Sequence, residues 1–404
     1  MKNKKLFLWI ALVITAIIPI YAQQYDSEKD FQFDWDDNGG VKIIKYLGQK
    51  REISIPQKIQ DILVTGIGNS VFKDNKNITR VTIPNGVTNI GNSAFQGCSS
   101  LTSINIPNTV TSIGTNAFRS CTSLTSIDIP DSVTSMGGGV FYDCSKIAKV
   151  TLGNGITGFN VYYDGIYEYG TFEKCNSLTS VNIPNSVTSI GNNTFRGCTS
   201  LTSILIPDNV KTIGYWAFRS CTSLTSIDIP DSVTSMGGGV FQNCSKLAKV
   251  TIGNGVTSFE SHTEYNDDAG FFERCTSLTS IIIPDSVTKI GWKSFKGCTS
   301  LTGVTIGNGV TVISNEAFSG CSSLTSVAIP SGVTVISEEA FAGCEKLISV
   351  NIQGTSERFR GTWGMSMNFS SKAFVGDLQT KYLADDGGPG VYNRFTGGNT
   401  WRKQ

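Results

Sequence analysis

The sequence predicts an α/β-type repeat solenoid that is rich in β structure and has about twelve turns of 23 residues. A unit written L-T-S-I-x-I-P-x-x-V-T-x-I-G-x-x-A-F-x-x-C-x-S recurs from about residue 53 to about residue 352. The eleven cysteines lie 23 residues apart except for two intervals of 31, Cys144 to Cys175 and Cys244 to Cys275. A phenylalanine stands three residues before each cysteine. A lone unit cannot bury enough apolar surface to fold, so the turns must stack.

Repeats of about 20 to 29 residues with leucines spaced L-x-x-L-x-L are typical of leucine-rich repeat solenoids, so we expect a right-handed superhelix. In the unit over residues 124–145, Leu124, Ile127 and Ile129 alternate with polar residues, which predicts a strand with its apolar side chains inward. The proline that follows cannot donate a ladder hydrogen bond and ends the strand. The phenylalanine and cysteine, at i and i+3, predict a short helical turn.

The middle of the chain looks like a segmental duplication of four units. Residues 117–141 and 217–241 are identical, and both read AFRSCTSLTSIDIPDSVTSMGGGVF. Three units of 23 residues and one of 31 give the offset of 100 residues between the copies. Each copy therefore contains one enlarged unit, and these two units differ much more than the turns around them.

The first 22 residues read as a secretory signal peptide. Lys2, Lys4 and Lys5 precede an apolar run over residues 6–20, and Ala22 offers a small residue for cleavage. The alternative is an uncleaved membrane anchor, but the run is short for a span of about 20 residues. We expect the mature chain, which has no transmembrane segment, to be secreted or held at the cell surface.

The rest of the chain divides into three parts. Residues 23–52 alternate apolar and polar side chains around Asn38-Gly39-Gly40, which predicts an N-terminal cap hairpin. The solenoid occupies residues 53–352. Residues 353–404 hold a degenerate last repeat, a C-terminal cap and a Gly-, Asn- and Thr-rich tail that we expect to be loosely ordered.

Charge and composition exclude some partners. Lys and Arg number 33 and Asp and Glu 32, so the concentrated basic excess that nucleic acid binding needs is missing. Charged residues make up 16% of the chain, compared with about 25% in ordinary domains. Ser, Thr, Asn and Gly replace them, which predicts a surface that contacts partners by hydrogen bonds.

The cysteines are expected to be free, buried thiols. Stacked turns place equivalent side chains about 4.8 Å apart and parallel. A disulfide needs Cβ atoms about 3.8 Å apart that point toward each other. The alternatives are a metal site or a redox relay, but the C-x-x-C and histidine spacings of zinc sites are missing from the sequence.

The repeated string, intact over residues 101–121, resembles the BspA-like leucine-rich repeat proteins of bacteria, and the resemblance covers roughly residues 53–352. The resemblance implies an exported surface or secreted protein. Several members of this family act as adhesins that bind host extracellular proteins, other cells or other bacteria. The family brings no catalytic residues and no cofactor.

A catalytic site needs one unique constellation of side chains, whereas most polar residues here recur in every turn. The single histidine, His262, leaves only one base for a Ser-His-Asp arrangement. The sequence has no G-x-S-x-G elbow, P-loop or H-E-x-x-H motif. We therefore expect no enzyme, no cofactor and no metal.

Unique residues gather in the two enlarged units, which we take as candidate partner-binding loops because loops on a rigid scaffold commonly carry binding. Tyrosine supplies contact area at a low entropy cost. The alternatives are solvated bulges, an Asp-rich calcium site in the second loop, and binding on the strand face instead. The candidate residues are Tyr162, Tyr163, Tyr167, Tyr169, His262, Glu264, Tyr265 and Asp268.

The predicted function is a non-enzymatic exported binding protein, an adhesin of the cell surface or secreted fraction. Its expected partners are proteins, such as host extracellular matrix proteins or bacterial surface proteins. The alternative is a structural envelope or matrix component without a specific ligand.

Overall fold

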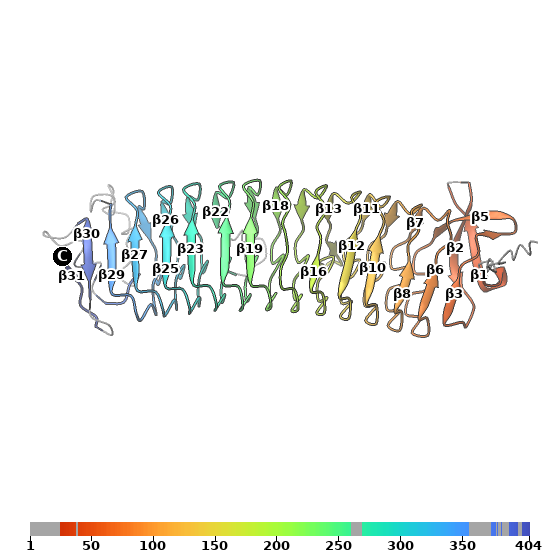
Figure 1. Ribbon diagram of the computed structural model, residues 1–404, viewed down its shortest axis with the longest axis horizontal. Coiled ribbons are helices and arrows are strands. Elements are labelled where there is room, and N and C mark those ends of the chain that lie inside the picture. Colours follow the sequence, from red (N-terminus) through yellow and green to blue (C-terminus); the bar gives the residue numbers. More distant parts are fainter. Residues whose placement is uncertain are drawn as a thin grey trace, which may run out of the picture.

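The chain folds into a straight rod of stacked turns with the N-terminal strands at one end and the C-terminus at the other (Figure 1). The computed structural model describes residues 25–37, 39–259, 269–354, 373–376, 378, 381, 388–394 and 398–404. The predicted signal peptide lies outside these residues. In the part of the chain that is described, no helix is long and apolar enough to cross a bilayer.

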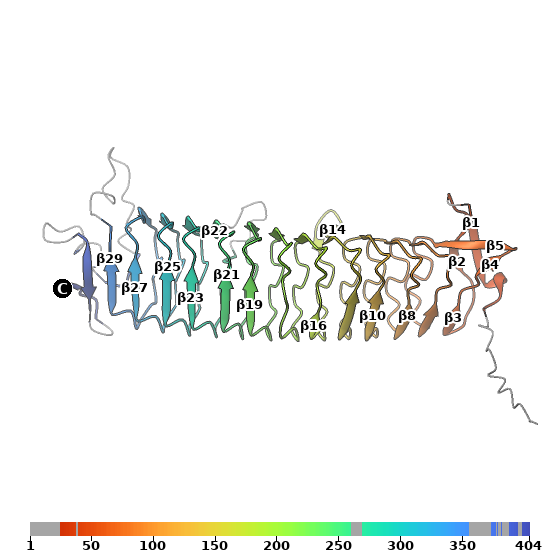
Figure 2. The ribbon, with the colours of Figure 1, turned by 45° about the horizontal axis from the view of Figure 1, so that its top comes forward.

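One long side of the rod, the strand face, carries the leucine-rich strands, which pair in parallel within short sheets (Figure 2). In one further turn, Asn182 and Leu205 form a single parallel bridge instead of a strand pair, so the face has 13 turns where about twelve were predicted. The strands are β3 (Glu52–Ser54), β6 (Arg80–Thr82), β8 (Ser103–Asn105), β10 (Ser126–Ile129), β12 (Lys149–Leu152), β16 (Ser180–Val181), β19 (Ser226–Ile229), β21 (Lys249–Ile252), β23 (Ser280–Ile283), β25 (Gly303–Ile306), β27 (Ser326–Ile329) and β29 (Ser349–Ile352).

The second side of the rod holds a second row of strands, again paired in parallel, and after β5 each of them is two residues long. They are β2 (Val41–Tyr46), β5 (Ile62–Ile67), β7 (Asn89–Ile90), β9 (Ser112–Ile113), β11 (Ser135–Met136), β13 (Gly158–Phe159), β17 (Ser189–Ile190), β18 (Thr212–Ile213), β20 (Ser235–Met236), β22 (Ser258–Phe259), β24 (Lys289–Ile290), β26 (Val312–Ile313) and β28 (Val335–Ile336). This sheet is interrupted between β11 and β13 and between β20 and β22, where the enlarged units begin. At the N-terminal end, β1 (Phe31–Trp35) pairs antiparallel with β2, and β4 (Lys58–Ile59) pairs antiparallel with β5.

On the third side of the rod, the described solenoid turns contain no helix. The predicted α/β class is therefore corrected to a β-solenoid. The short 3-10 helix η1 (Glu28–Asp30) precedes the solenoid. The residue two after each stacked phenylalanine adopts positive φ, and so does the residue two before most of them, as Ser120 (φ 56) and Asn116 (φ 56) do around Phe118. A left-handed residue ends a right-handed helix, so the predicted helical turn cannot form. The Phe118 N–H instead donates to the Val140 carbonyl of the next turn at 3.0 Å.

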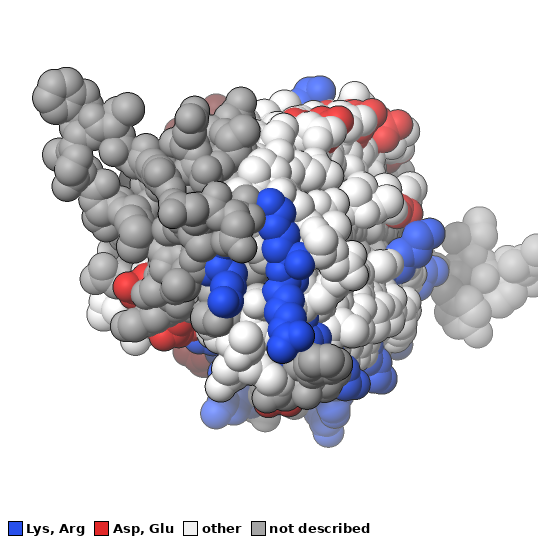
Figure 3. Space-filling view, turned by 90° about the vertical axis from the view of Figure 1, so that its left-hand side faces the viewer, with Lys and Arg blue, Asp and Glu red and all other residues white. Residues whose placement is uncertain are grey.

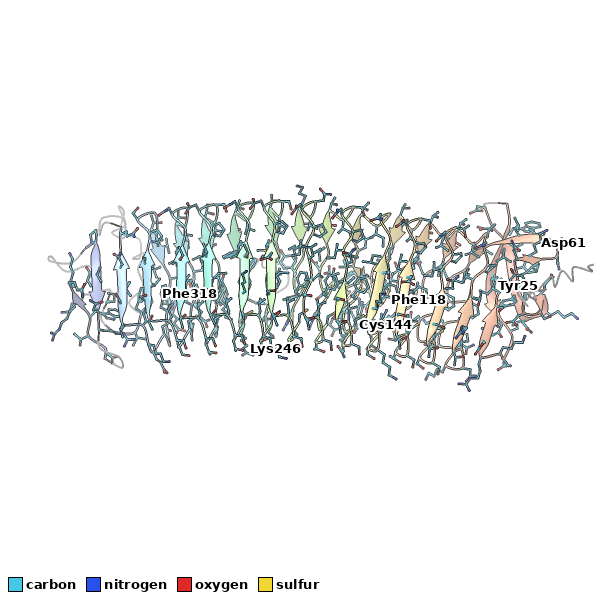
Figure 4. The ribbon with its side chains drawn as sticks, viewed as in Figure 1. Tyr25, Asp61, Phe118, Cys144, Lys246 and Phe318 are labelled. Carbon is cyan, nitrogen blue, oxygen red and sulfur yellow. The ribbon has the colours of Figure 1, made fainter. Side chains whose placement is uncertain are left out.

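A stack of phenylalanine rings runs through the core, one ring per turn, from Phe72 to Phe374. Figure 4 labels two of its members, Phe118 and Phe318. Neighbouring ring centroids lie 4.5 to 5.6 Å apart with interplanar angles of 4 to 12°. Phe374 shows that the degenerate last repeat continues the stack. Phe159 and Phe259 meet the stack edge-on at the two enlarged units.

The eleven cysteines form the predicted column of free, buried thiols beside this stack. Each Sγ–H donates to the carbonyl of the phenylalanine one turn back, at 3.0 to 3.3 Å. Burial raises the pKa of every one of these thiols, to about 12 for Cys98 and Cys144. They are therefore unreactive packing groups in the folded chain.

The prediction of a loosely ordered tail is wrong for the described residues of the C-terminal segment. β30 (Gly390–Asn393) pairs antiparallel with β29, and β31 (Arg402–Lys403) pairs antiparallel with β30. Trp401 is fully buried, and its indole N–H donates to the Val375 carbonyl at 2.8 Å. Arg394 donates to the Cys344 and Glu345 carbonyls at 3.1 Å. These contacts order the described residues of the segment although its composition is rich in Gly, Asn and Thr.

Lys and Arg side chains gather on the C-terminal end of the rod (Figure 3). Both residues of β31 are exposed and basic. Charges on an edge strand oppose pairing with strands of other molecules.

Candidate functional site

The first enlarged unit forms a β-hairpin on the rod. Its strands are β14 (Tyr162–Tyr163) and β15 (Glu168–Tyr169), which pair antiparallel. In Figure 2, β14 lies along the same upper edge of the rod as β22, the strand that leads into the second enlarged unit. The structure brings Tyr162 and Tyr169 together, with ring centroids 6.0 Å apart.

Asp164 holds the hairpin turn. One carboxylate oxygen accepts hydrogen bonds from the N–H groups of Ile166 at 2.9 Å and Tyr167 at 2.8 Å. The other accepts from the Tyr169 hydroxyl at 2.8 Å. These hydrogen bonds, chiefly the one from the Tyr167 N–H, lower the pKa of Asp164. The hydrogen bond to the Asp164 carboxylate raises the pKa of Tyr169. The turn is ordered before any partner arrives, which reduces the entropy lost on binding.

The tip of the hairpin is apolar and exposed. Tyr163 is 60% exposed, Ile166 75% and Tyr167 65%. Three such side chains within five residues form a local apolar patch on a surface made mostly of small polar groups. The sequence prediction included both tyrosines but missed Ile166, although the spacing within the loop places it beside them.

A cluster of cations and aromatic rings supports the base of the hairpin. The guanidinium carbon of Arg119 lies 4.3 Å from the Tyr169 ring centroid and 4.8 Å from that of Tyr142. The two rings meet edge-to-face with centroids 4.8 Å apart. Lys174 Nζ donates to the Tyr142 hydroxyl at 2.6 Å, and this bond raises the pKa of the lysine. Sequence reasoning missed Arg119, Tyr142 and Lys174.

Glycines in the preceding turn make room for the hairpin. A Cβ atom at Gly138 would lie 2.0 Å from the Val161 carbonyl carbon and 2.2 Å from the Tyr162 nitrogen. Both atoms belong to the backbone and cannot rotate away. The glycine run of the duplicated segment therefore allows the hairpin backbone to contact the rod directly.

The return strand is fixed by two carboxylates. Asn192 Nδ2 donates to Glu168 at 2.8 Å. Glu173 is 4% exposed, accepts from the Gly170 N–H at 3.1 Å and lies 3.8 Å from the Arg196 guanidinium. Burial raises the pKa of Glu173. The hairpin is thus tied to the turns on both sides of it.

The remaining predicted site residues, His262, Glu264, Tyr265 and Asp268, lie outside the described residues. The second enlarged unit is described only at its two ends. Among the described residues, no group of three or more His, Cys, Asp or Glu side chains could hold a metal ion.

Threonine hydroxyls of the strand face are partly used within the scaffold. Threonine hydroxyls donate to carbonyls of the preceding turn, as Thr102 does to Thr79 at 2.9 Å and Thr302 to Thr279 at 3.1 Å. These donors are engaged within the scaffold. A shallow groove of about 610 Å³ on this face lies beside Leu205, which is 71% exposed, and Asp228.

Stacked leucine-rich turns around one continuous core define a repeat scaffold whose extended surface typically serves binding. The chain belongs to the BspA type leucine-rich repeat family, whose model matches residues 49–163, 166–269 and 267–363. This match confirms the resemblance of the repeated string. A comparison with curated proteins found no match.

The chain is similar to several solved structures, one of which shares the fold with a TM-score above 0.5. A leucine-rich repeat protein from Bacteroides ovatus is 26% identical with a TM-score of 0.62, covering 86% of this chain and 94% of that chain. A leucine-rich cell surface protein from Faecalibacterium prausnitzii is 29% identical with a TM-score of 0.44, covering 83% of this chain and 96% of that chain. The leucine-rich repeat protein of T. pallidum is 28% identical with a TM-score of 0.41, covering 55% of this chain and 91% of that chain.

Proposed function

We propose that this chain is an exported, non-enzymatic binding protein of the cell surface or secreted fraction, an adhesin that holds a protein partner with its first hairpin. The observation that carries the proposal is the exposed tip of Tyr163, Ile166 and Tyr167 on a turn fixed by Asp164. Rigid aromatic side chains that stand above a scaffold bury large area at a low entropy cost.

The arrangement favours a protein partner over other classes. Tyr, Trp and Arg are enriched at protein interfaces. The chain, with 33 basic and 32 acidic residues, lacks the basic excess that nucleic acid binding needs. The polar residues recur from turn to turn, which suits an extended contact surface better than a single catalytic constellation.

Export rests on the proposed signal peptide, residues 1–22. We further propose that the antiparallel strands at the two ends of the rod act as caps, since they stop the parallel sheets from presenting a raw edge. Retention of the mature chain at the surface fits the cell-surface description of the relative from Faecalibacterium prausnitzii.

Deleting residues 161–168 tests the role of the hairpin, because it restores the 23-residue length of an ordinary unit. Residues 23–404 are immobilised and probed with purified extracellular matrix proteins and bacterial surface proteins. We expect saturable binding to a defined protein, weakened at least tenfold by the deletion and by a Tyr163→Ser, Ile166→Ser, Tyr167→Ser triple variant. Leu205→Ser, which removes an exposed apolar side chain from the strand face, is the matched control.

Two outcomes contradict the proposal. Weak, non-saturable adsorption of every probe means a structural envelope or matrix component. Saturable binding that survives the deletion in a folded rod, but falls with Leu205→Ser, moves the contact to the strand face.

A further inference from the structure

The two copies of the duplicated segment present different surfaces on the strand face. In each copy, four turns expose one side chain in the middle of the strand segment and one directly after the proline or glycine that ends it. These segments span residues 101–108, 124–131, 147–154 and 178–185 in the first copy, and 201–208, 224–231, 247–254 and 278–285 in the second. The constant offset of 100 residues allows them to be compared position by position.

The eight exposed positions are identical at four places and differ at the other four. Wherever they differ, the first copy has asparagine. The second copy has an apolar residue at two mid-strand positions and aspartate at two positions after the strand. The four pairs are Asn105 and Leu205, Asn182 and Ile282, Asn108 and Asp208, and Asn185 and Asp285. The second copy is therefore both more apolar and more acidic on this face.

Leu205 and Ile282 are the most exposed large apolar side chains on the described strand face, at 71% and 68%. They lie three turns apart, which is about 14 Å at about 4.8 Å per turn. Asp228 and Thr251 stand between them and pair in parallel across β19 and β21, which β23 follows along the rod (Figure 2). A single exposed apolar residue is ordinary on a protein surface. Two of them that flank acidic side chains at a fixed distance offer paired anchors for one ligand.

The groove of about 610 Å³ on this face is lined by Leu205 and by the carboxylates of Asp208, Asp228 and Asp231. Asp231 is held in place, since its Oδ1 accepts a hydrogen bond from the Asn254 N–H at 2.7 Å. The side chains of Asp208 and Asp228 make no hydrogen bond or ion pair with any described residue. These two carboxylates are therefore available to a ligand.

The charge of this face favours a basic partner. Over the four strand segments, the second copy carries four aspartates and one lysine, a net charge of −3. The first copy carries two aspartates and one lysine there, a net charge of −1. Complementary charge steers a partner of opposite sign to the surface and disfavours partners of like sign. The charged residues of the second copy are Asp208, Asp228, Asp231, Lys249 and Asp285.

We propose that these side chains form a docking surface for a basic, extended segment of a protein partner. We name it the second-copy patch, made of Leu205, Asp208, Asp228, Asp231, Ile282 and Asp285. In an extended chain, side chains four residues apart face the same way and lie about 13 Å apart, at about 3.3 Å per residue. Two apolar side chains at this spacing cover Leu205 and Ile282, and the lysines or arginines between them reach the carboxylates.

The patch goes beyond the proposed function, because it serves a second partner. The first hairpin stands at the upper edge of the rod, whereas the patch lies on the strand face (Figure 2). A protein held by the hairpin therefore leaves the patch open.

Synthetic peptides test the spacing and the charge. Fluorescein-labelled peptides carry, between Gly-Ser flanks, the sequence Leu-Lys-Lys-Lys-Leu, its rearrangement Lys-Leu-Leu-Lys-Lys, or variants with both Leu replaced by Ser or all Lys replaced by Glu. Binding to residues 23–404 is followed by fluorescence anisotropy. We expect the first peptide to bind at least about tenfold tighter than the other three, because it combines both apolar contacts with the matching charge.

Variants that give the second copy the residues of the first locate the contact. Leu205→Asn with Ile282→Asn should weaken the first peptide at least about tenfold, and Asp208→Asn with Asp285→Asn should weaken it several-fold. These chains should keep the fold, because the first copy carries asparagine at the same positions. Ala328→Asn, at an exposed mid-strand position two turns beyond Ile282, is the matched control and should change nothing.

The reverse exchange tests whether the patch is sufficient. The changes Asn105→Leu, Asn108→Asp, Asn182→Ile and Asn185→Asp, made together, rebuild the patch on the first copy. This chain should bind two peptides per rod instead of one. Circular dichroism and thermal unfolding confirm that each variant is folded.

The proposal is overturned if the four peptides bind alike, if Ala328→Asn weakens binding as much as the paired asparagine variants do, or if the rebuilt first copy adds no site. Self-association in sedimentation equilibrium that is lost with Leu205→Asn and Ile282→Asn, without peptide binding, would instead assign the patch to a second copy of the chain. Deletion of residues 161–168 should leave peptide binding unchanged. Failure of the patch and failure of the hairpin are therefore separate results.

Discussion

The column of buried thiols makes the stability of the rod sensitive to alkaline pH. Burial raises the pKa of Cys98, Cys144, Cys244, Cys298 and Cys344 to about 12, and the pKa of the other six is also raised. An unfolded thiol has a pKa of 9.0. Above about pH 9 the unfolded chain therefore releases protons that the folded chain keeps, and the free energy of unfolding falls as pH rises.

The loss is large because the unit repeats. At pH 10 a thiol of pKa 9.0 in the unfolded chain, still protonated in the folded chain, lowers the free energy of unfolding by about 1.4 kcal/mol. Together the eleven thiols lower the free energy of unfolding by about 15 kcal/mol at pH 10. Whole domains are stable by only about 5 to 15 kcal/mol, so we expect the rod to unfold near pH 10.

Urea unfolding between pH 7 and pH 10.5, in the presence of a reductant, measures this loss. A variant with Ala at Cys198, Cys221, Cys244 and Cys275 is the control, since seven thiols remain and the loss at pH 10 should fall to about 10 kcal/mol. Its lower stability at pH 7, from the cavities it creates, does not enter this difference. A flat profile, or an equal loss in the variant, would refute the linkage of stability to buried thiols.

Two further predictions concern the hairpin and the C-terminal end. Gly138→Ala should lower the free energy of unfolding by about 1 to 3 kcal/mol through overpacking against the hairpin backbone, and should speed hydrogen exchange at the Ile166 and Tyr167 amides. Gly303→Ala, where a Cβ meets nothing within 4 Å, should leave both unchanged, and equal behaviour of the two variants would mean that the hairpin does not lie against Gly138. Trp401→Ala should cost about 3 to 5 kcal/mol and speed exchange in β29 and β30, whereas Trp35→Ala, 68% exposed, should change stability by less than about 0.5 kcal/mol. Slow exchange in β29 after loss of Trp401 would show that this indole does not secure the last turns.

The repeat made most of the fold predictable. The cysteines recur every 23 or 31 residues and so define the register of the repeat. In a stack of turns, this register places equivalent side chains side by side. The helical turn was predicted wrongly because i, i+3 spacing says nothing of φ. Two residues before the phenylalanine, the left-handed region is adopted by Asn116 but also by Trp216 and Glu316, so residue type alone does not reveal it.

The candidate site was predictable only in part, because several of its contacts join the loop to side chains of ordinary turns. The hairpin tyrosines stand out by composition, but Arg119 and Tyr142 belong to ordinary turns and gain their role from Tyr169. Arg119 and Tyr142 are 23 residues apart and each follows a stacked phenylalanine, so the register predicts that they are neighbours. The tail was misjudged because a few anchors, such as Trp401, decide its order while glycine and asparagine dominate its composition.

The two copies of the duplicated segment differ at positions where a substitution does not disturb the phenylalanine stack. A core phenylalanine touches the phenylalanines of both neighbouring turns, so any change of size there is felt by three turns at once. Beside Gly239, outside the phenylalanine stack, the small residue Ala269 leaves room for the large residue Trp216. Substitutions can therefore accumulate outside the stack without disturbing the rod.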